Sequence, residues 1–221
     1  MRKDELINDE YYHVFNRSIA KFKIFNSEFD YHRFLELIKY YQYERPTLRY
    51  SYFNRLSANL KQNYLSSMYE NSKIVDIVSY CLMPTHFHLL LKQNIDDGIV
   101  DYLRLIENSY SKYFNLVHKR KGPLWESRFK NVHIETDEQI LHLTRYIHLN
   151  PTSAGFCNKP EEWGWSSYSE YTNITNEYKI CSYKNILDIK PKEYQKFVND
   201  RKKYQQELSK IKSHLIDNYS G

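Results

Sequence analysis

The chain has 221 residues, of which 41% are hydrophobic and 27% are charged, and its formal net charge is +5. These values allow one good-sized domain with an appendage, and they suit a polyanionic ligand without requiring one. No apolar run approaches the roughly 20 residues that span a bilayer. The three cysteines lack a CxxC spacing, which argues against a disulfide scaffold and a zinc ribbon. We expect a cytoplasmic protein that does not enter a membrane.

The first third of the chain predicts a strand, a helix and an insertion. Aromatic and β-branched residues dominate 11–17, as is typical of a strand. Ser27 is a suitable N-cap, and apolar residues then recur at helical spacing over 28–43. The polar stretch 44–72 shows no strand period, although apolar residues spaced by four allow a surface helix. We interpret this stretch as an insertion.

The middle of the chain predicts strands and helices in alternation. Two apolar runs, 73–83 and 86–93, are typical of strands. The two-residue break between them indicates either a hairpin or one bulged strand. A long amphipathic helix is expected over 99–120 and a strand over 125–134. A further helix is expected over 136–149, where an Asn-Pro dipeptide would end it.

The order of these elements predicts the fold class. Helices alternate with strands that include a close pair, so we expect an α+β fold with an antiparallel central sheet covered by helices. This is close to the ferredoxin-like or split βαβ arrangement. An aromatic turn or short helix is expected over 163–171. Residues 183–221 hold nine Lys or Arg against five Asp or Glu, and we interpret them as a basic, helical C-terminal appendage to a domain over 1–182.

The first candidate site is His86-Phe87-His88. Side chains alternate faces along a strand, so the two imidazoles point the same way and can share one metal ion. Two polar rings inside an apolar strand need a reason. The alternative is a pair of partly exposed histidines on an edge strand, since metal sites usually need a third protein ligand.

The second candidate site lies on the helix expected over 136–149. His142, Tyr146 and Asn150 are spaced by four and therefore share one helix face. Tyr146 offers a phenolic oxygen, and Asn150 offers an amide oxygen that suits a hard metal ion. The alternative is a core tyrosine followed by an asparagine that stops the helix.

The third candidate is a basic segment with aromatic residues. Positive side chains interleaved with Trp125 and Phe129 suit a nucleic-acid groove, with charges for phosphates and rings for bases. The alternative is a solvated basic turn beside a buried tryptophan. The sequence shows no P-loop, GxGxxG, HExxH or GxSxG motif that would indicate another chemistry.

Taken in order, these segments resemble single-tyrosine transposases of the HUH superfamily, and in particular the REP-associated tyrosine transposases. YCLMPTHFHLLLK (80–92) resembles the HUH block of that family, and YHVFNRS (12–18) its first strand. The stretch 110–130 resembles the long helix and basic turn, RYIHLNPTSAGF (145–156) the catalytic helix, and WGWSSYSEY (163–171) the closing aromatic segment. The resemblance covers roughly residues 11–171.

The resemblance implies roles for four residues. His86 and His88 match the histidines that bind a divalent metal ion, Mg²⁺ or Mn²⁺. Tyr146 matches the nucleophile. Asn150 stands where relatives place a polar third metal ligand, often Gln, and it is shorter than Gln by one methylene.

The resemblance also implies cleavage and rejoining of single-stranded DNA through a 5′-phosphotyrosine intermediate, with recognition of a short hairpin. Relatives work as monomers or homodimers. Six residues are then candidates for DNA binding: Arg17, Arg120, Lys121, Trp125, Arg128 and Lys130. Two alternatives remain open, a regulator that binds DNA hairpins without cleavage and a protein directed at RNA.

Overall fold

The computed structural model describes residues 5–44, 46–174 and 179–200 of the chain. Its strands form one antiparallel sheet in the order β2-β3-β1-β4. Their bounds are β1 (Tyr11–Arg17), β2 (Val75–Met83), β3 (His86–Gln93) and β4 (Lys130–Ile134). With one helical connection between β1 and β2 and another between β3 and β4, this is the split βαβ arrangement. The predicted α+β fold class is confirmed.

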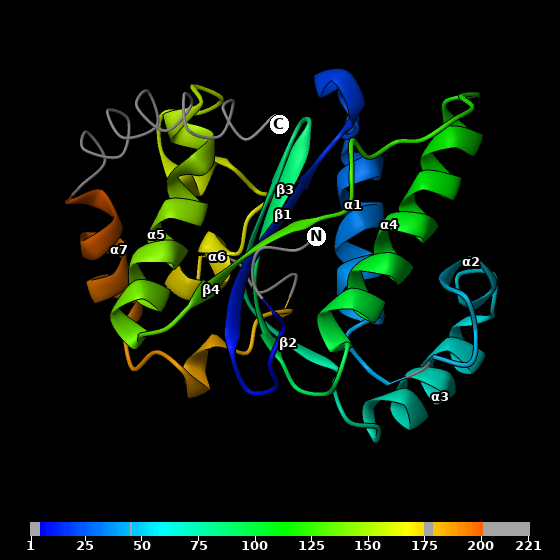
Figure 1. The fold of residues 1–221 in the computed structure, drawn as a ribbon, viewed down its shortest axis with the longest axis horizontal. Coiled ribbons are helices and arrows are strands. Elements are labelled where there is room, and N and C mark those ends of the chain that lie inside the picture. The colour runs from blue at the N-terminus through cyan, green and yellow to red at the C-terminus, as the bar shows by residue number, and fades with distance from the viewer. Residues whose placement is uncertain (1–4, 45, 175–178, 201–221) are drawn as a thin grey trace.

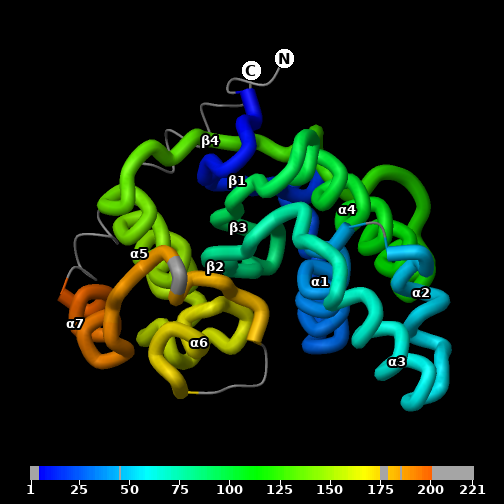
Figure 2. Tube along the Cα trace, turned by 90° about the horizontal axis from the view of Figure 1, so that it is seen from below, coloured from blue at the N-terminus to red at the C-terminus, as the bar shows by residue number. Residues whose placement is uncertain are grey.

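Helices cover both faces of this sheet, as Figures 1 and 2 show from two directions. One layer holds α1 (Glu28–Tyr40) and α4 (Gly98–Val117), and the other holds α5 (Asp137–Ser153), α6 (Tyr168–Thr172) and α7 (Pro191–Asn199). α2 (Tyr50–Phe53) and α3 (Ala58–Tyr69) lie beside α1, away from the sheet. Short 3-10 turns are η1 (Ile19–Lys21), η2 (Pro160–Glu162) and η3 (Tyr183–Asn185).

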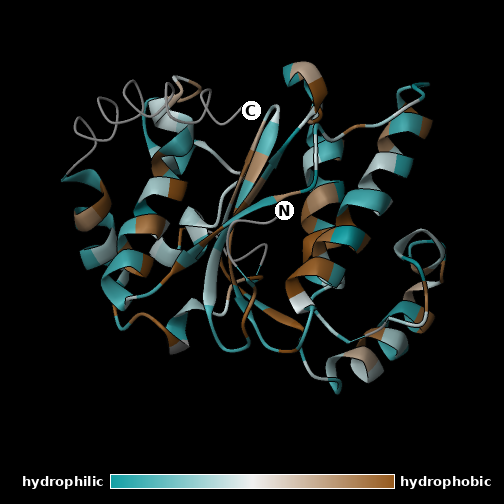
Figure 3. Cartoon of the chain, in the orientation of Figure 1, coloured by the Kyte–Doolittle hydropathy of each residue, from teal (hydrophilic) through white to brown (hydrophobic). Residues whose placement is uncertain are grey.

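The two helical layers enclose two separate apolar cores, because successive side chains of a strand point to opposite faces. Tyr12, Val14 and Phe87 enter the core beneath α1 and α4. Cys81 and Leu90 point to the other face, where they meet apolar residues of α5, α6 and α7. Figure 3 shows apolar segments along both the strands and the inner helices. The sheet is therefore buried on both faces.

The connections confirm some expectations and correct two. β2 and β3 form a hairpin around a two-residue turn, rather than one bulged strand. The strand expected over 125–134 begins only at Lys130, because Trp125 makes a single bridge to Ser18 and the residues after it turn.

The second correction concerns the end of the helix that carries Tyr146. α5 does not stop at Asn150 but continues through Pro151 to Ser153. Proline removes one backbone donor, yet the helical bonding resumes at once, since the Ala154 amide donates to the Asn150 carbonyl at 2.9 Å. Asn150 is therefore held inside a helix rather than at its frayed end.

The stretch 44–72, expected as an insertion with a surface helix, supplies α2 and α3. Its aromatic side chains pack on the end of α1, where the Tyr40 hydroxyl donates to the Leu48 carbonyl at 2.8 Å. The Tyr50 amide donates to the Tyr41 hydroxyl at 3.1 Å. These contacts fix α2 to the body of the fold.

The described part of the predicted C-terminal appendage packs on α5, and residues 201–221 lie outside the described residues. The Tyr194 hydroxyl of α7 lies 2.6 Å from His148 Nδ1 and donates to Thr144 Oγ1 at 3.0 Å. His148 and Tyr194 are fully buried. α7 thus satisfies polar groups of α5 that have no access to water.

Replacing Tyr194 with Phe tests this contact. The change removes one hydroxyl and leaves the His148 Nδ1–H without its partner, which costs about 1–3 kcal/mol for a buried donor. We expect the free energy of unfolding in urea to fall by that amount. Tyr52→Phe, at a site that is 56% exposed, is the matched control and should change it by less than about 0.5 kcal/mol. Equal stability of the two variants would contradict the role given to α7.

Candidate active site

The two histidines of the hairpin lie on one face of the central sheet. β3 pairs with both β1 and β2, so it is an interior strand and not the edge strand that the alternative interpretation requires. The rings of His86 and His88 are 5.0 Å apart, and His88 is only 4% exposed. Phe87 points to the opposite core, as the alternation predicts.

α5 brings Tyr146 and Asn150 over these histidines. Thr136 caps the helix by accepting a hydrogen bond from the Gln139 amide at 3.2 Å. The Asn150 Nδ2 atom lies 3.3 Å from His88 Nε2. The Tyr146 ring meets the His88 ring edge-on at 5.9 Å. Two segments that are about sixty residues apart in the chain therefore contribute to one cluster.

A fifth residue, His13 of β1, belongs to the same cluster and was missed by the sequence interpretation. Its Nε2 atom lies 3.0 Å from His88 Nδ1, and its ring lies 6.1 Å from the Tyr146 ring. The signal in the sequence was the alternation of 11–17, which puts His13 on one face with Arg17. Its partner could not be identified without knowing that β1 pairs with β3.

The donor set fits a metal ion with few protein ligands. Burial lowers the pKa of His86 to about 4, with a further contribution from the Arg17 charge, and burial lowers that of His88 well below its usual value. Both imidazoles are therefore neutral at pH 7, as ligands must be. His86 Nδ1 contacts the Thr85 hydroxyl at 3.0 Å, and His88 Nδ1 contacts His13 Nε2 at 3.0 Å. A metal would therefore bind at Nε2 of each ring, and at His88 it would replace the contact with the Asn150 amide.

The protein ligands available to such a metal are limited. Among the described residues, no group of three or more His, Cys, Asp or Glu side chains is placed to hold one. A metal at His86 and His88 would therefore need an oxygen ligand, which the Asn150 amide offers, and further oxygens from outside the protein.

The phenol of Tyr146 is protonated at neutral pH. Burial raises its pKa, and a hydrogen bond with Asn150 partly offsets this effect. Tyr110 and Tyr113, the other tyrosines near the basic turn, lie on α4 on the opposite side of the sheet from α5. Tyr146 is thus the tyrosine that the fold places beside the histidine pair.

The six candidates for DNA binding fall into separate places. Arg17 lies directly opposite His86 in the β1–β3 pairing, and Lys130 begins β4 opposite Phe15. The Arg17 guanidinium forms an ion pair with Glu126, with Nη2 3.1 Å from Oε1. Arg17 and Lys130 are therefore on the sheet face of the histidines.

The other four candidates lie in the loop that joins α4 to β4. Arg120 supports this loop, since its guanidinium donates to the Pro123 carbonyl at 2.7 Å. The Trp125 indole N–H donates to the Glu107 carbonyl at 3.2 Å, and its ring lies 5.5 Å from that of Phe87. Lys121 and Arg128 are exposed. Trp125 thus packs against the side of the apolar core beneath α1 and α4.

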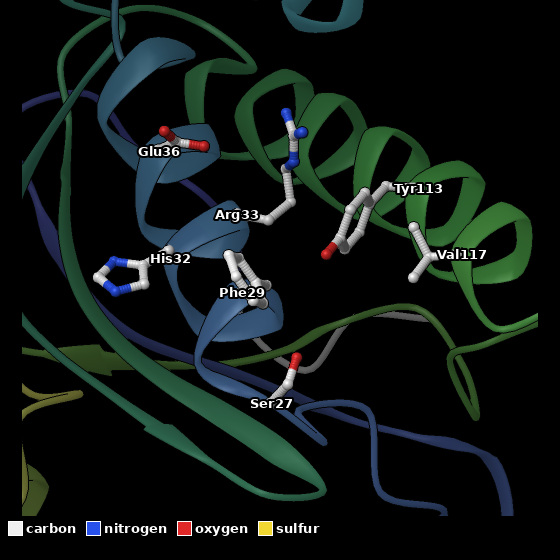
Figure 4. Close-up of a pocket in the computed structure, with 7 residues that line it drawn as sticks. All are labelled: Ser27, Phe29, His32, Arg33, Glu36, Tyr113 and Val117. Carbon is white, nitrogen blue, oxygen red and sulfur yellow. The ribbon is translucent and has the colours of Figure 1, made fainter.

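A surface cavity lies between α1 and the end of α4 (Figure 4). Its volume is about 670 Å³, and it is lined by Ser27, Phe29, His32, Arg33, Glu36, Tyr113 and Val117. The Arg33 guanidinium stacks over the Tyr113 ring at 4.8 Å. None of the residues of the histidine cluster lines it.

The fold and the cluster together define a class, an α+β protein with a His-x-His strand at its centre facing a tyrosine on a helix. Comparison with known proteins agrees. Residues 43–150 match the model of the family described as "Transposase IS200 like". A putative REP-associated tyrosine transposase from Haemophilus influenzae is 23% identical over 103 residues, which are 42% of this chain and 58% of that protein.

A solved structure shares the fold. The REP-associated tyrosine transposase bound to a REP hairpin superposes with a TM-score of 0.54 at 15% identity, covering 86% of this chain and 94% of that one. The match to the curated Haemophilus protein spans less than two thirds of its length. These comparisons agree with the sequence-based resemblance: the chain is similar, over part of its length, to IS200-like and REP-associated tyrosine transposases. Within the described residues, no helix is long and apolar enough to cross a membrane.

The position of Trp125 leads to a prediction about stability. Trp125→Ala removes a large, partly buried ring that packs against the core, so the cost lies below the roughly 3–5 kcal/mol of a fully buried ring, at about 2–3 kcal/mol. We expect a drop of that size in the free energy of unfolding, measured in urea. Lys121→Ala, in the same loop but exposed, should change it by less than about 0.5 kcal/mol. If the Trp125→Ala protein had wild-type stability, the Trp125 ring would not contribute to packing, and a role in ligand binding alone would be indicated.

Proposed function

We propose that this protein is a transposase-type enzyme that cleaves and rejoins single-stranded DNA through Tyr146, with the help of a divalent metal ion. The observation that carries the proposal is the convergence of Tyr146 and Asn150 from α5 on His86 and His88 of β3. Two alternating positions on a strand and two positions one helical turn apart meet in one place. Core packing alone does not require polar side chains at all four.

His86, His88 and the Asn150 amide would hold the metal ion, Mg²⁺ or Mn²⁺. Such an ion would withdraw charge from the non-bridging oxygens of the scissile phosphate. Imidazole nitrogens with an amide oxygen suit Mn²⁺ somewhat better, whereas Mg²⁺ is more available. In the structure the Nδ2 atom of the Asn150 amide faces His88, and a half-turn about the last side-chain bond would present its oxygen to the metal instead.

Tyr146 would act as the nucleophile. Its hydroxyl oxygen loses a proton and forms a bond to the phosphorus, and the bond from phosphorus to the 3′ oxygen breaks. The departing strand takes up a proton and leaves as a 3′-hydroxyl, while the 5′ phosphate stays on the tyrosine. This covalent link conserves the energy of the phosphodiester, so a second 3′-hydroxyl can reverse the step without ATP.

The substrate we propose is a single strand that carries a hairpin. Arg17 and Lys130 lie on the face of the histidines, where they would bind phosphates next to the scissile one. Lys121 and Arg128 lie in the loop before β4 and would contact the backbone further away. Because His86, His88, Tyr146 and Asn150 lie together within one chain, a monomer could hold the proposed centre, and a homodimer is equally compatible with it.

Replacing Tyr146 with Phe tests the nucleophile. We expect the wild-type protein to form a covalent adduct with a 5′-labelled or 3′-labelled hairpin oligonucleotide in Mn²⁺, and only the label downstream of the cut to stay with the protein. Tyr146→Phe should abolish the adduct, because the attacking oxygen is gone, and should keep hairpin binding. Tyr113→Phe is the control and should form it normally. An adduct that survives in Tyr146→Phe would assign the nucleophile elsewhere.

Removing one histidine tests the metal site. We expect His86→Ala to weaken Mn²⁺ binding at least tenfold in isothermal titration calorimetry, since a direct ligand is lost. His133→Ala is the matched control, because His133 lies on β4 and pairs with Glu10 at 3.0 Å. Chelation by EDTA should stop adduct formation in the wild type.

The same experiments separate the alternative functions. Hairpin binding that ignores EDTA, with no adduct in any divalent metal, would indicate a regulator that binds DNA without cleaving it. The observation that favours this regulator is the small number of metal ligands among the described residues. Competition between DNA and RNA hairpins of the same sequence would distinguish a DNA protein from one directed at RNA.

A further inference from the structure

The histidine pair of β3 is supported by a third histidine from the neighbouring strand. In the β1–β3 pairing, Phe15 is opposite His88 and His13 is opposite Leu90. His13 is therefore the diagonal neighbour of His88 on the same face of the sheet. The rings of His13 and His88 are nearly parallel, with an angle of 21° between their planes and centroids 5.2 Å apart. The contact joins His13 Nε2 to His88 Nδ1 at 3.0 Å.

We propose that His13 is a positioning residue that holds His88 in one tautomer, with the hydrogen on Nδ1 and the lone pair on Nε2. The tautomer is a property of the protein without metal. Its catalytic meaning, a His88 prepared to bind the metal ion through Nε2, rests on the function proposed above.

The hydrogen bonds around His88 determine this tautomer together. A neutral imidazole has one N–H and one acceptor nitrogen. The Asn150 Nδ2 group lies 3.3 Å from His88 Nε2 and, as an amide N–H, can only donate. With the Asn150 amide in this orientation, that of the protein without metal, Nε2 of His88 is the acceptor, Nδ1 carries the hydrogen, and His13 Nε2 accepts a hydrogen bond from it.

His13 acts through His88 and is not itself a ligand. Its Nε2 atom faces the Nδ1 side of the His88 ring, whereas the proposed metal position lies at Nε2. Within the described residues, no three His, Cys, Asp or Glu side chains are arranged to share a metal. Metal-bound histidines usually donate their second ring N–H to a carboxylate or a carbonyl, which fixes the ring and raises its basicity. Here an imidazole takes that place.

His13 also touches the proposed nucleophile. Its ring meets the Tyr146 ring edge-on at 6.1 Å, and the Phe15 ring lies 5.1 Å away on the same strand. One side chain therefore sets the orientation of His88 and forms part of the surface against which Tyr146 rests. This arrangement gives a histidine at position 13 a purpose that a leucine of similar size could not fulfil.

The first experiment measures the tautomer directly in the full-length, metal-free protein. Two-bond ¹H–¹⁵N correlation spectra distinguish a protonated from an unprotonated ring nitrogen, and the spectrum of His88→Gln assigns the His88 signals. We expect Nδ1 of His88 to be protonated in the wild type. In His13→Phe, which keeps the ring but lacks the acceptor, we expect His88 to shift to the other tautomer or to a mixture. Nε2 protonated in the wild type would overturn the proposal, whatever the result with metal.

The second experiment measures Mn²⁺ affinity by titration calorimetry, independently of cleavage. We expect His13→Phe to weaken binding by about 10–100-fold, the usual effect of losing a supporting hydrogen bond. His13→Gln, whose amide oxygen can accept from Nδ1, should restore most of the affinity. His133→Phe removes a histidine from β4 that does not contact His88, and it should leave the affinity unchanged. Circular dichroism checks that each variant is folded.

The outcomes separate this inference from the function on which it rests. Unchanged affinity and tautomer in His13→Phe would overturn the positioning role. Equal loss of Mn²⁺ binding in His13→Phe and His13→Gln would make His13 a direct ligand and overturn it as well. A wild type that binds no Mn²⁺, yet shows the expected tautomer, would refute the proposed metal chemistry and keep the assignment of His13.

Discussion

The site depends on one buried side chain, His148, whose hydrogen bonds attach α5 to the rest of the molecule. This imidazole contacts the Tyr194 hydroxyl at 2.6 Å and the Ser167 hydroxyl at 2.7 Å, and Ser167 in turn accepts from the Tyr80 amide of β2 at 2.9 Å. Burial lowers the pKa of His148 to about 3, so it stays neutral. Because His148 lies between Tyr146 and Asn150 in the chain, fixing it fixes both of them over β3.

Placing two imidazoles inside an interior strand opposes stability, and the structure compensates for it locally. A buried polar group without a partner costs several kcal/mol. His86 has the Thr85 hydroxyl as a partner, and His88 has one partner on each ring nitrogen. Phe87 meanwhile contributes its whole ring to the opposite core. The strand thus serves packing on one face and polar chemistry on the other.

The sequence predicted what is local and missed what depends on pairing between distant segments. The hairpin, the shared face of His86 and His88 and the shared face of Tyr146 and Asn150 follow from the periods of strands and helices. His13 could not be assigned, because its role depends on the β1–β3 register. The strand predicted over 125–134 is too long, because the aromatic residues after Pro123 are typical of a strand, whereas the Trp125 ring packs against the core.

The charges around the site would let the proposed enzyme, with a net charge of only +5, bind a polyanion at a defined point. Arg17 lies opposite His86 in the β1–β3 pairing, and its charge helps to lower the pKa of His86. Glu126 neutralises the charge of Arg17, and the hydrogen bond from Arg17 lowers the pKa of that carboxyl.

A phosphate that bound Arg17 would have to displace the carboxylate of Glu126. A single weak backbone contact gains little by displacing it, although the pair is partly exposed and such pairs contribute only about 0–1 kcal/mol. A DNA strand that is bound both by the exposed cations of the loop and by the site would displace Glu126 from Arg17. Binding at the loop holds its phosphate near Arg17 at a high local concentration. The ion pair between Arg17 and Glu126 therefore favours a DNA that contacts both places over one that contacts either alone.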